Sequence, residues 1–584
     1  MAGAKIFFIF IIFNLLLSAQ RKDSAFTHSN SDLGLSGSIL LRNCLSPSGT
    51  DTNITQTVSK ISQLDSTLSR PDSLFSDIFF ETDQLESNYF DDLFDIIYTI
   101  PNNLQEGNFL IKSRVKNQFF PKKPENYKGN NYKLYNRLIA DFGKARLSIV
   151  TEKDAGEDNY LDFINLSLMI KDIYPINKII LGSYNLEFGE GLILWSPFRT
   201  YKSSNEIFRI RNNKNNLNQY IGSNETNFLY GGASSISFGE FNITPFYSQR
   251  KFDGYKTPTG LHRTENEIAK KNINSEILYG GMLNFFKKDI IEAGLLFYNQ
   301  ENQNFYSLSY KSKYNRIGIS GEVAYLNSTA FSNSITLRLS GNNFLYSKFR
   351  YFPKYFYSSY SGAFSEGDNS NNETGFYFGI NSEIFSSLQL DAYVDIFKRS
   401  SPDSLFNFFQ NGKEYFINLI YKIRKQEELR ISFKQKESFN STKRISLKLY
   451  YIFQLFSELS LSTRFDYVSV DCNQSKEEGF HLFEEISYRP SKKVQVNFRV
   501  SFFSTPSYDS RIYIYERDVN GIFSNFIAYN RGIHIYLLSK FAITNRFKLG
   551  LKYSDSLKSE EFDLISLKKS NRNNNLTIQI EAAF

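Results

Sequence analysis

The chain ends on Leu576-Thr-Ile578-Gln-Ile580-Glu-Ala582-Ala-Phe584. Apolar side chains occupy the even positions of this stretch, and Thr577, Gln579 and Glu581 alternate with them. Because successive side chains of a strand point to opposite faces, the stretch predicts a β-strand with one apolar and one polar face.

A chain that ends on such a strand resembles the bacterial outer-membrane β-barrels, whose last strand closes the barrel and is read by the assembly machinery. The resemblance implies that Ile578, Ile580 and Phe584 form the closing and assembly signal of this chain. It also implies two partners, which are the lipid of the outer membrane and the barrel-assembly machinery.

The same alternation recurs along most of the sequence, for example in 317–325, 388–396, 459–467, 494–500 and 547–553. In these segments the charged residues fall on the face opposite to the apolar one, which would be a wet lumen; they are Asp391, Arg464, Asp466 and Arg499. Short links such as 142–144, 238–240 and 544–545 alternate with long polar ones such as 187–227 and 251–274. This sorting is typical of a membrane barrel, with short periplasmic turns and long outer loops.

Counting the segments predicts an all-β, single-chain, antiparallel transmembrane β-barrel of about 24 strands, with a range of 22–26. An even number is expected when both ends of the barrel lie in the periplasm. The stretch Ile512–Glu516 is interpreted as an extension of the strand that starts near residue 493.

The composition agrees with this fold class. Aromatic residues make up 16% of the 584 residues, yet the mean hydropathy is only −0.37. Past the N-terminus no apolar run is long enough for a membrane helix. Alternating membrane strands reconcile these facts, because half of each strand is allowed to be polar. A secreted β-protein with an aromatic core remains the alternative.

The N-terminus predicts export. Lys5 is followed by the largely apolar Ile6–Leu17 and by Ala19, so residues 1–19 are expected to be a cleavable signal peptide. Residues 20–107 are expected to be a flexible periplasmic segment with one or two short helices and a possible periplasmic partner, and residues 108–584 the barrel. These expectations place the protein in the outer membrane of a Gram-negative bacterium.

Other classes of site lack support in the sequence. The two cysteines, Cys44 and Cys472, cannot form a disulfide framework or a zinc site. The net charge of +8 is spread along the chain and does not support a nucleic-acid partner. We expect no cofactor and no metal.

Three motifs give more specific information than the composition does. They read Lys153-Asp154-Ala-Gly156-Glu157, Phe188-Gly189-Glu-Gly191-Leu-Ile-Leu-Trp195 and Thr259-Gly-Leu-His262-Arg263-Thr-Glu265-Asn-Glu267. In this order they resemble an outer-membrane β-barrel family of Bacteroidota and related bacteria, catalogued as helix-hairpin-helix (ComEA-like) proteins. Members of that family commonly carry an N-terminal helix-hairpin-helix, a small DNA-backbone-binding unit with a Gly-x-Gly hairpin. Residues 20–107 lack this hairpin, so the resemblance does not imply DNA binding for this chain.

Each motif has two interpretations. Glycines and the residues Trp195 and Arg199 suggest that 187–227 folds into the lumen and constricts it, and the alternative is an ordered external loop. Two roles are open for the cluster of His262, Arg263, Glu265 and Glu267. It would recognise a ligand or form ion pairs between loops, and the second role is favoured. Asp154 and Glu157 would bind a divalent cation or, as is favoured, lie in a solvated turn.

The leading functional hypothesis is a channel, or the membrane component of a transport or secretion system, with an inward-folding constricting loop. The first alternative is a surface receptor or scaffold barrel with a closed lumen. The second is an outer-membrane hydrolase, which would place His262, His481 or His534 beside Ser and Asp. No local signature assigns such partners, and we expect no enzyme.

Overall fold

The structure is a computed structural model. It describes residues 108–120, 123–195, 215–226, 228–255, 259–287, 290–367, 370–402, 410–424, 426–439, 441–472, 475–558 and 572–584. The signal peptide expected at 1–19, the segment 20–107, His28 and Arg199 lie outside these residues.

The first half of the chain forms these elements: β1 (Asn108–Phe120), β2 (Tyr132–Asp141), β3 (Ala145–Lys153), β4 (Phe163–Ile173), β5 (Ile176–Glu187), β6 (Asn216–Gln219), β7 (Leu229–Phe238), β8 (Phe241–Phe252), α7 (Glu265–Ala269), β9 (Asn274–Lys287), β10 (Ile291–Gln300), β11 (Gln303–Tyr314) and β12 (Ile317–Leu326).

The second half continues with β13 (Ser328–Arg338), β14 (Phe344–Phe352), β15 (Glu373–Phe385), β16 (Leu388–Lys398), β17 (Asn411–Arg424), β18 (Glu427–Glu437), β19 (Lys443–Phe456), β20 (Leu459–Cys472), β21 (Ser475–Ser491), β22 (Val494–Ser504), β23 (Ile512–Glu516), β24 (Ser524–Ala528), β25 (Arg531–Ala542), β26 (Phe547–Lys558) and β27 (Arg572–Ala583). No helix in the described ranges is long and apolar enough to cross a membrane.

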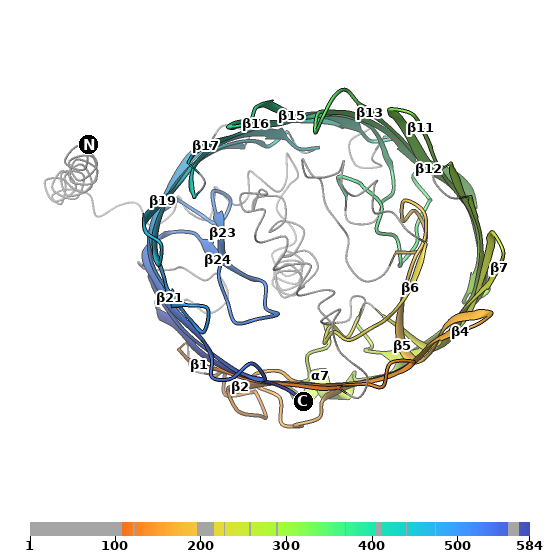
Figure 1. Cartoon of the computed structure of the whole chain (residues 1–584), viewed down its shortest axis with the longest axis horizontal. Coiled ribbons are helices and arrows are strands. Elements are labelled where there is room, and N and C mark those ends of the chain that lie inside the picture. Colours follow the sequence, from red (N-terminus) through yellow and green to blue (C-terminus); the bar gives the residue numbers. More distant parts are fainter. Residues whose placement is uncertain are drawn as a thin grey trace, which may run out of the picture. The chain divides into compact units, whose positions relative to one another are not determined.

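Twenty-four of these strands form a closed antiparallel barrel, which confirms the predicted fold class and strand number. Figure 1 shows the strands as a ring, with β6, β23 and β24 inside it. Closure comes from the pairing of β1 with β27. The backbone N–H groups of Phe109 and Phe584 each donate to the carbonyl oxygen of the other residue, at 3.1 and 2.9 Å.

Side chains alternate between the two faces as the sequence predicts. In β27, Ile578 and Ile580 are about 40% exposed on the outside, whereas Thr577 and Gln579 are buried on the inside. Asp391, Arg464, Asp466 and Arg499 also lie on the inner face. They are buried there, and Arg464–Asp466 and Arg499–Glu485 form ion pairs with N–O distances of 2.7 Å.

Connections are sorted by length between the two ends of the barrel. The end that carries residues 108 and 584, called here the short-turn end, has links such as 142–144, 239–240 and 543–546. The opposite end, called the long-loop end, carries 188–228, 253–273, 353–372 and 505–530. The long connections thus lie at one end as predicted, but that end also carries the short links 301–302 and 327.

One strand assignment is wrong. Ile512–Glu516 does not extend the strand from residue 493, which ends at Ser504 as β22. It forms β23, which pairs with β24 in a separate two-stranded sheet. Its apolar residues Ile512 and Ile514 pack on inner-wall residues such as Phe483 and Phe503, and Tyr513 between them is buried as well, so the strand is enclosed within the barrel.

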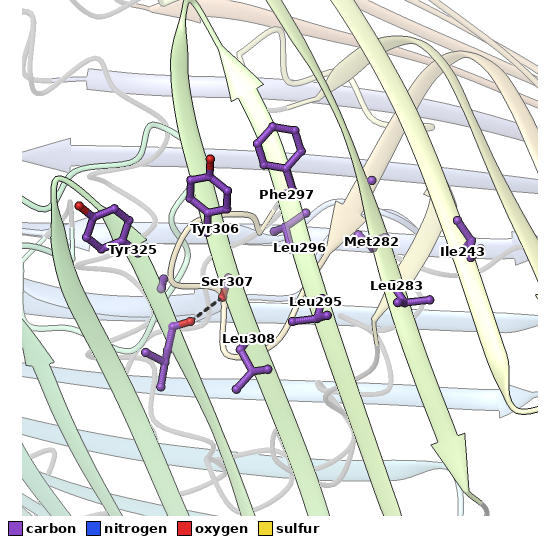
Figure 2. Close-up of a pocket in the computed structure, with 13 residues that line it drawn as sticks. Ile243, Met282, Leu283, Leu295, Leu296, Phe297, Tyr306, Ser307, Leu308 and Tyr325 are labelled. Carbon is purple, nitrogen blue, oxygen red and sulfur yellow. Dashed lines mark hydrogen bonds between the residues drawn. The ribbon is translucent and has the colours of Figure 1, made fainter.

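Large apolar side chains are exposed on the outside of the barrel. A shallow depression of about 640 Å³ is lined by residues of β8–β12, among them Ile243, Leu283 and Phe297 (Figure 2). A surface of this kind, lined almost wholly by carbon atoms, suits contact with hydrocarbon chains.

The exposed side of β27 supports a direct test of this orientation. Ile578→Lys would place a charge on the outer face near mid-barrel, and we expect it to lower the free energy of unfolding in lipid vesicles by about 2–4 kcal/mol. Asn575→Lys, on the inner face of the same strand, is the control and should cost less than about 1 kcal/mol. Equal costs at both positions would contradict the assignment of the faces.

Candidate functional site

Two of the three motifs meet at the long-loop end. Glu157, in the β3–β4 loop, accepts a hydrogen bond from the backbone N–H of His262, in the β8–β9 loop, at 2.9 Å. The other carboxylate oxygen of Glu157 accepts from the backbone N–H of Asp154 at 2.7 Å. Both Glu157 and His262 are buried. Glu157 therefore joins two loops that are about a hundred residues apart in the sequence.

Gly156 is required by the packing at this junction. Its φ of +96° lies in a region that favours glycine, and an added Cβ would overlap the Tyr127 ring and come within 3.2 Å of Arg263 Cγ. The guanidinium of Arg263 lies 4.8 Å from the centre of the Tyr127 ring. The β1–β2 loop is thus a third partner in the cluster.

His262 is held between two carboxylates. Its Nδ1 faces Asp162, and its Nε2 lies 3.2 Å from both carboxylate oxygens of Asp253. Two acceptors require both ring nitrogens to carry protons, which makes the ring a cation. Burial alone would lower the pKa of His262, but the hydrogen bonds that the ring donates to Asp162 and Asp253 outweigh burial and raise the pKa to about 10.

Further groups complete the charge balance of this cluster. Lys271 Nζ contacts Asp162 at 2.7 Å. Burial alone would raise the pKa of Asp162, but the hydrogen bonds that it accepts from His262 and Lys271 lower it. Burial raises the pKa of Glu157 to about 7 and that of Glu225 to about 9. We call His262, Asp162, Asp253, Glu157 and Lys271 the loop clasp.

The rest of the third motif caps α7. Thr264 and Glu267 form a capping box, in which each side chain accepts from the backbone N–H of the other residue. Glu267 also pairs with Arg263 at 2.7 Å, and Glu265 forms an ion pair with Lys128 of the β1–β2 loop. The fork of Arg263 is therefore engaged within the cluster.

A metal ion is the second possible occupant of the clasp. Donor atoms of Glu157, Asp162 and His262 lie within 4.8 Å of one another, and one imidazole with two carboxylates is a ligand set that transition metals accept. His262 would have to lose a proton and its contact with Asp162 to take part. The solvated turn favoured for Asp154 and Glu157 is wrong for Glu157, which is buried, and Asp154 pairs with Lys133 at 2.6 Å.

The second motif lies inside the barrel. Phe188, Leu192, Ile193 and Leu194 are fully buried and belong to a large apolar cluster with inner-wall residues such as Leu278. Residues 188–195 are thus inward-folded, as the sequence suggested for the start of this connection, and Figure 1 shows β6 of the same connection inside the ring.

A buried carboxylate on the inner wall holds this segment. Glu322 of β12 accepts from the backbone N–H groups of Glu190 at 2.6 Å and Leu192 at 3.1 Å. Ser307 donates to its other oxygen at 2.6 Å. Glu190 in turn pairs with Lys348 of β14 at 2.7 Å. We call Glu190, Glu322 and Lys348 the segment anchor.

The glycines of the motif make the anchor possible. Gly189 has a φ of +57°, and an added Cβ would lie 2.6 Å from Glu322 Oε2. Gly191 has a φ of +79°, and its carbonyl oxygen accepts from the N–H of Gly362, at 2.9 Å. The N–H of Trp195 donates to the Tyr360 carbonyl oxygen at 2.8 Å. The β14–β15 loop therefore packs on the same segment.

A third inward element comes from the β22–β25 connection. The Arg499 guanidinium donates to the Tyr515 carbonyl oxygen at 2.6 Å and pairs with Glu485 at 2.7 Å. Glu516 and Asp518 both contact Lys552 of β26, at 3.1 and 2.9 Å. The β23–β24 hairpin is thus fixed to the wall by buried ion pairs.

The histidines do not form a hydrolytic arrangement in the described part of the chain. His481 Nδ1 contacts Asp466 at 2.7 Å, and His534 Nε2 lies 2.5 Å from Glu516. None of the hydrogen bonds found for His262, His481 or His534 in these ranges involves a serine hydroxyl. A serine nucleophile next to a histidine base is the feature that a hydrolase would need.

Comparisons with known proteins concern the fold. No family model and no curated protein matches the sequence. A chain of the E. coli P pilus tip assembly intermediate PapC-PapD-PapK-PapG matches with a TM-score of 0.45 and 6% identity, over 84% of this chain and 62% of that one. The Pseudomonas aeruginosa ferric enterobactin receptor PfeA gives 0.39 and 8%, over 82% and 81%. The NanC porin gives 0.21 and 9%, over 36% and 93%.

The TM-scores of these three structures are all below 0.5, so their likeness carries no argument about this chain. The closed antiparallel barrel is shown by the chain's own strand pairing.

The loop clasp should be pH-dependent. Because the folded pKa of His262 is above its ordinary value of 6.5, its stabilising effect is complete below that value and is lost as the pH rises through about 10. Limited proteolysis of the β8–β9 loop should therefore accelerate between about pH 6 and about pH 10. In His262→Gln the loop should be cleaved fast throughout, because a buried pair worth about 3 kcal/mol is broken.

Lys128→Gln is the control for the clasp. It removes an exposed ion pair with Glu265, so it should change the local stability by less than about 1 kcal/mol. A pH-independent cleavage rate in the wild-type protein would contradict a protonated His262.

The segment anchor predicts a difference between two glycines with similar backbone angles. Gly189→Ala adds a clash with Glu322 to the strain of a positive φ, whereas Gly239→Ala, at φ +60°, meets nothing within 4 Å. We expect thermal unfolding in detergent to show a cost of about 1–2 kcal/mol for Gly239→Ala and clearly more for Gly189→Ala. Equal costs would mean that Glu322 does not constrain Gly189.

Proposed function

We propose that the protein is an integral outer-membrane channel, or the membrane component of a transport or secretion system, whose lumen is constricted by inward-folding segments. The first support is the closed barrel with an apolar exterior and charged inner-wall residues. A barrel of this strand number is wide enough to hold a plugged or partly filled lumen.

The observation that carries the proposal is the segment anchor. A loop that only covered the barrel mouth would not need a fully buried carboxylate deep in the wall to hold its backbone. Glu322 supplies acceptors for two N–H groups of residues 190–192, and burying a carboxylate is costly unless its partners are this well placed. The inner wall is thus built to keep this segment inside, which is what a constriction requires.

The receptor or scaffold with a closed lumen is the second candidate function. The size of the apolar cluster around Phe188 and Leu194 favours it, because this packing fills the space next to one side of the wall. The loop clasp also gives the long-loop end a fixed surface. A hydrolase has no comparable support, and we propose that the protein is not an enzyme.

The topology adds a location and partners to this proposal. Export by the predicted signal peptide 1–19 would bring the chain to the periplasm, and β27 would be the strand read by the assembly machinery. In this orientation the short-turn end is periplasmic and the clasp faces the cell exterior. Residues 20–107 would then meet any periplasmic partner.

Releasing the anchor provides the test. Glu322→Ala combined with Lys348→Met removes the contacts of residues 190–192 with Glu322 and Lys348. Among the hydrogen bonds and ion pairs described between this segment and the wall, it leaves only the hydrogen bond from Ser320 to Glu190. In planar lipid bilayers it should raise single-channel conductance about twofold or more. The matched control is Lys476→Ala with Glu478→Ala, an exposed ion pair near the same end of the barrel. Circular dichroism would establish that all variants keep their strand content.

Unchanged conductance in the anchor variant would contradict a constricting role for this segment. If neither the wild-type protein nor the anchor variant conducts ions, the closed-lumen receptor becomes the better description.

A further inference from the structure

The inner wall at the place where the barrel closes carries a row of cations. β1 contributes three of them and β2 two, all at alternating positions on the inner face: Lys112, Arg114, Lys116, Lys133 and Arg137. On the outward face of β1, Ile111 and Val115 are exposed apolar residues, with Ser113 between them. We call these five residues the basic seam.

The register of the two strands places like charges directly opposite each other. Lys112 faces Arg137, and Lys116 faces Lys133. Such cross-strand pairs destabilise a sheet. If stability alone determined the sequence of the wall, opposite charges would be expected at these positions. Such a pair is present on the other side of β1, where Lys112 faces Glu581 of β27.

Only part of this charge is neutralised. Lys112 pairs with Glu581 at 3.0 Å, and Lys133 pairs with Glu152 at 2.8 Å and Asp154 at 2.6 Å. Within the ranges that the structure describes, Arg114, Lys116 and Arg137 form no ion pair.

The uncompensated groups remain available to a ligand. Arg114 stacks on Tyr135 with its guanidinium carbon 4.4 Å from the ring centre, which leaves the edge of the guanidinium to donate hydrogen bonds. The Nε of Arg137 is buried without a hydrogen-bond partner, and Lys116 is exposed on the inner face.

The nearest inward element offsets only part of this charge. In the β23–β24 connection, Glu516 and Asp518 both contact Lys552 of β26. Asp518 also attracts Arg114 and Lys116 electrostatically, but it forms no ion pair with either of them in the described residues. The contact that this element makes with Lys112 is a backbone carbonyl, that of Asn520, which accepts at 3.0 Å. No carboxylate of this element is therefore paired directly with Arg114, Lys116 or Arg137 in the described residues.

We propose that the basic seam is a binding site and path for anionic solutes that carry carboxylate or phosphate groups. This rests on the proposed channel function and names its class of substrate. Residues two apart on a strand are about 7 Å apart, so Lys112, Arg114 and Lys116 form successive sites along the barrel axis. Anion pores use Lys and Arg on their walls in this way, with several sites of moderate strength.

Ion selectivity tests the path. In planar bilayers with a KCl gradient, the reversal potential of the wild-type protein should show a preference for chloride over potassium. The triple variant Arg114→Gln, Lys116→Gln, Arg137→Gln should reduce this permeability ratio about twofold or more. The control, Lys413→Gln, Lys443→Gln, Lys476→Gln, removes the same charge from exposed positions on the outer face and should leave the ratio unchanged.

A binding measurement separates the seam from the channel function. Citrate and, in a second titration, pyrophosphate would be added to the purified protein in detergent and followed by calorimetry. The triple variant should bind at least one of them about tenfold or more weakly than the wild type and the control. Binding of citrate alone or pyrophosphate alone would assign the site to carboxylates or to phosphates.

The outcomes are distinct. If the wild-type protein conducts no ions but loses anion binding in the triple variant, the channel proposal fails and the seam remains an anion site. If the wild-type protein and the triple variant share both reversal potential and affinity, or if the wild type neither prefers chloride nor binds the two anions, the seam proposal is overturned.

Discussion

In hydrocarbon every backbone N–H and C=O group needs a partner within the protein, and this constraint governs the whole molecule. The pairing of β1 with β27 meets it, because it removes the two free edges that a sheet of this size would otherwise expose. Closure with both ends on one side fixes an even number of strands, and it sorts the connections into short turns and long loops. The long loops then have two places to go, across the mouth or into the lumen, and this chain uses both.

The fold could be predicted because a strand in a barrel wall leaves a local signature. Alternation placed Asp391 and Arg499 on the inner face and Ile578 on the outer face from sequence alone, and the structure agrees. The sequence predicts a strand at Ile512–Glu516 but misplaces it, because the strand lies in a hairpin packed on the inner wall, where Ile512, Tyr513 and Ile514 are all buried. Its partner β24 has no apolar alternation, so nothing in the sequence indicates a second sheet. The motifs identified Glu157 and His262, but Asp162 and Asp253 acquire their role only when separate loops meet. Glu322 could be placed on the inner face, but its backbone partners lie about 130 residues away.

The inward elements follow a common electrostatic rule. A segment that enters the lumen brings backbone donors and charged side chains into a confined space where an unpaired group is costly. Residues 188–195 therefore bring Glu190 to Lys348 and give two N–H groups to Glu322, and the β23–β24 hairpin brings Glu516 and Asp518 to Lys552. In both cases the wall holds a complementary group at the right position. Glycines at 189 and 191 serve this rule indirectly, because they allow the backbone to come close enough for the carboxylate of Glu322 to reach it.

The basic seam departs from this rule, and the departure is informative because it lies in the wall itself. Facing cations such as Lys112 and Arg137 push β1 and β2 apart, and a free two-stranded ribbon could relieve the repulsion by shifting its register. In the closed barrel that escape is blocked, since β1 is also paired with β27, and a shift by one residue would turn Ile111 and Val115 into the lumen. The apolar outer face thus fixes the register of β1 and β2, and this register keeps the like charges opposite each other on the inner face. Closure thus allows this chain to keep facing cations that its own carboxylates neutralise only in part, at Lys112 and Lys133.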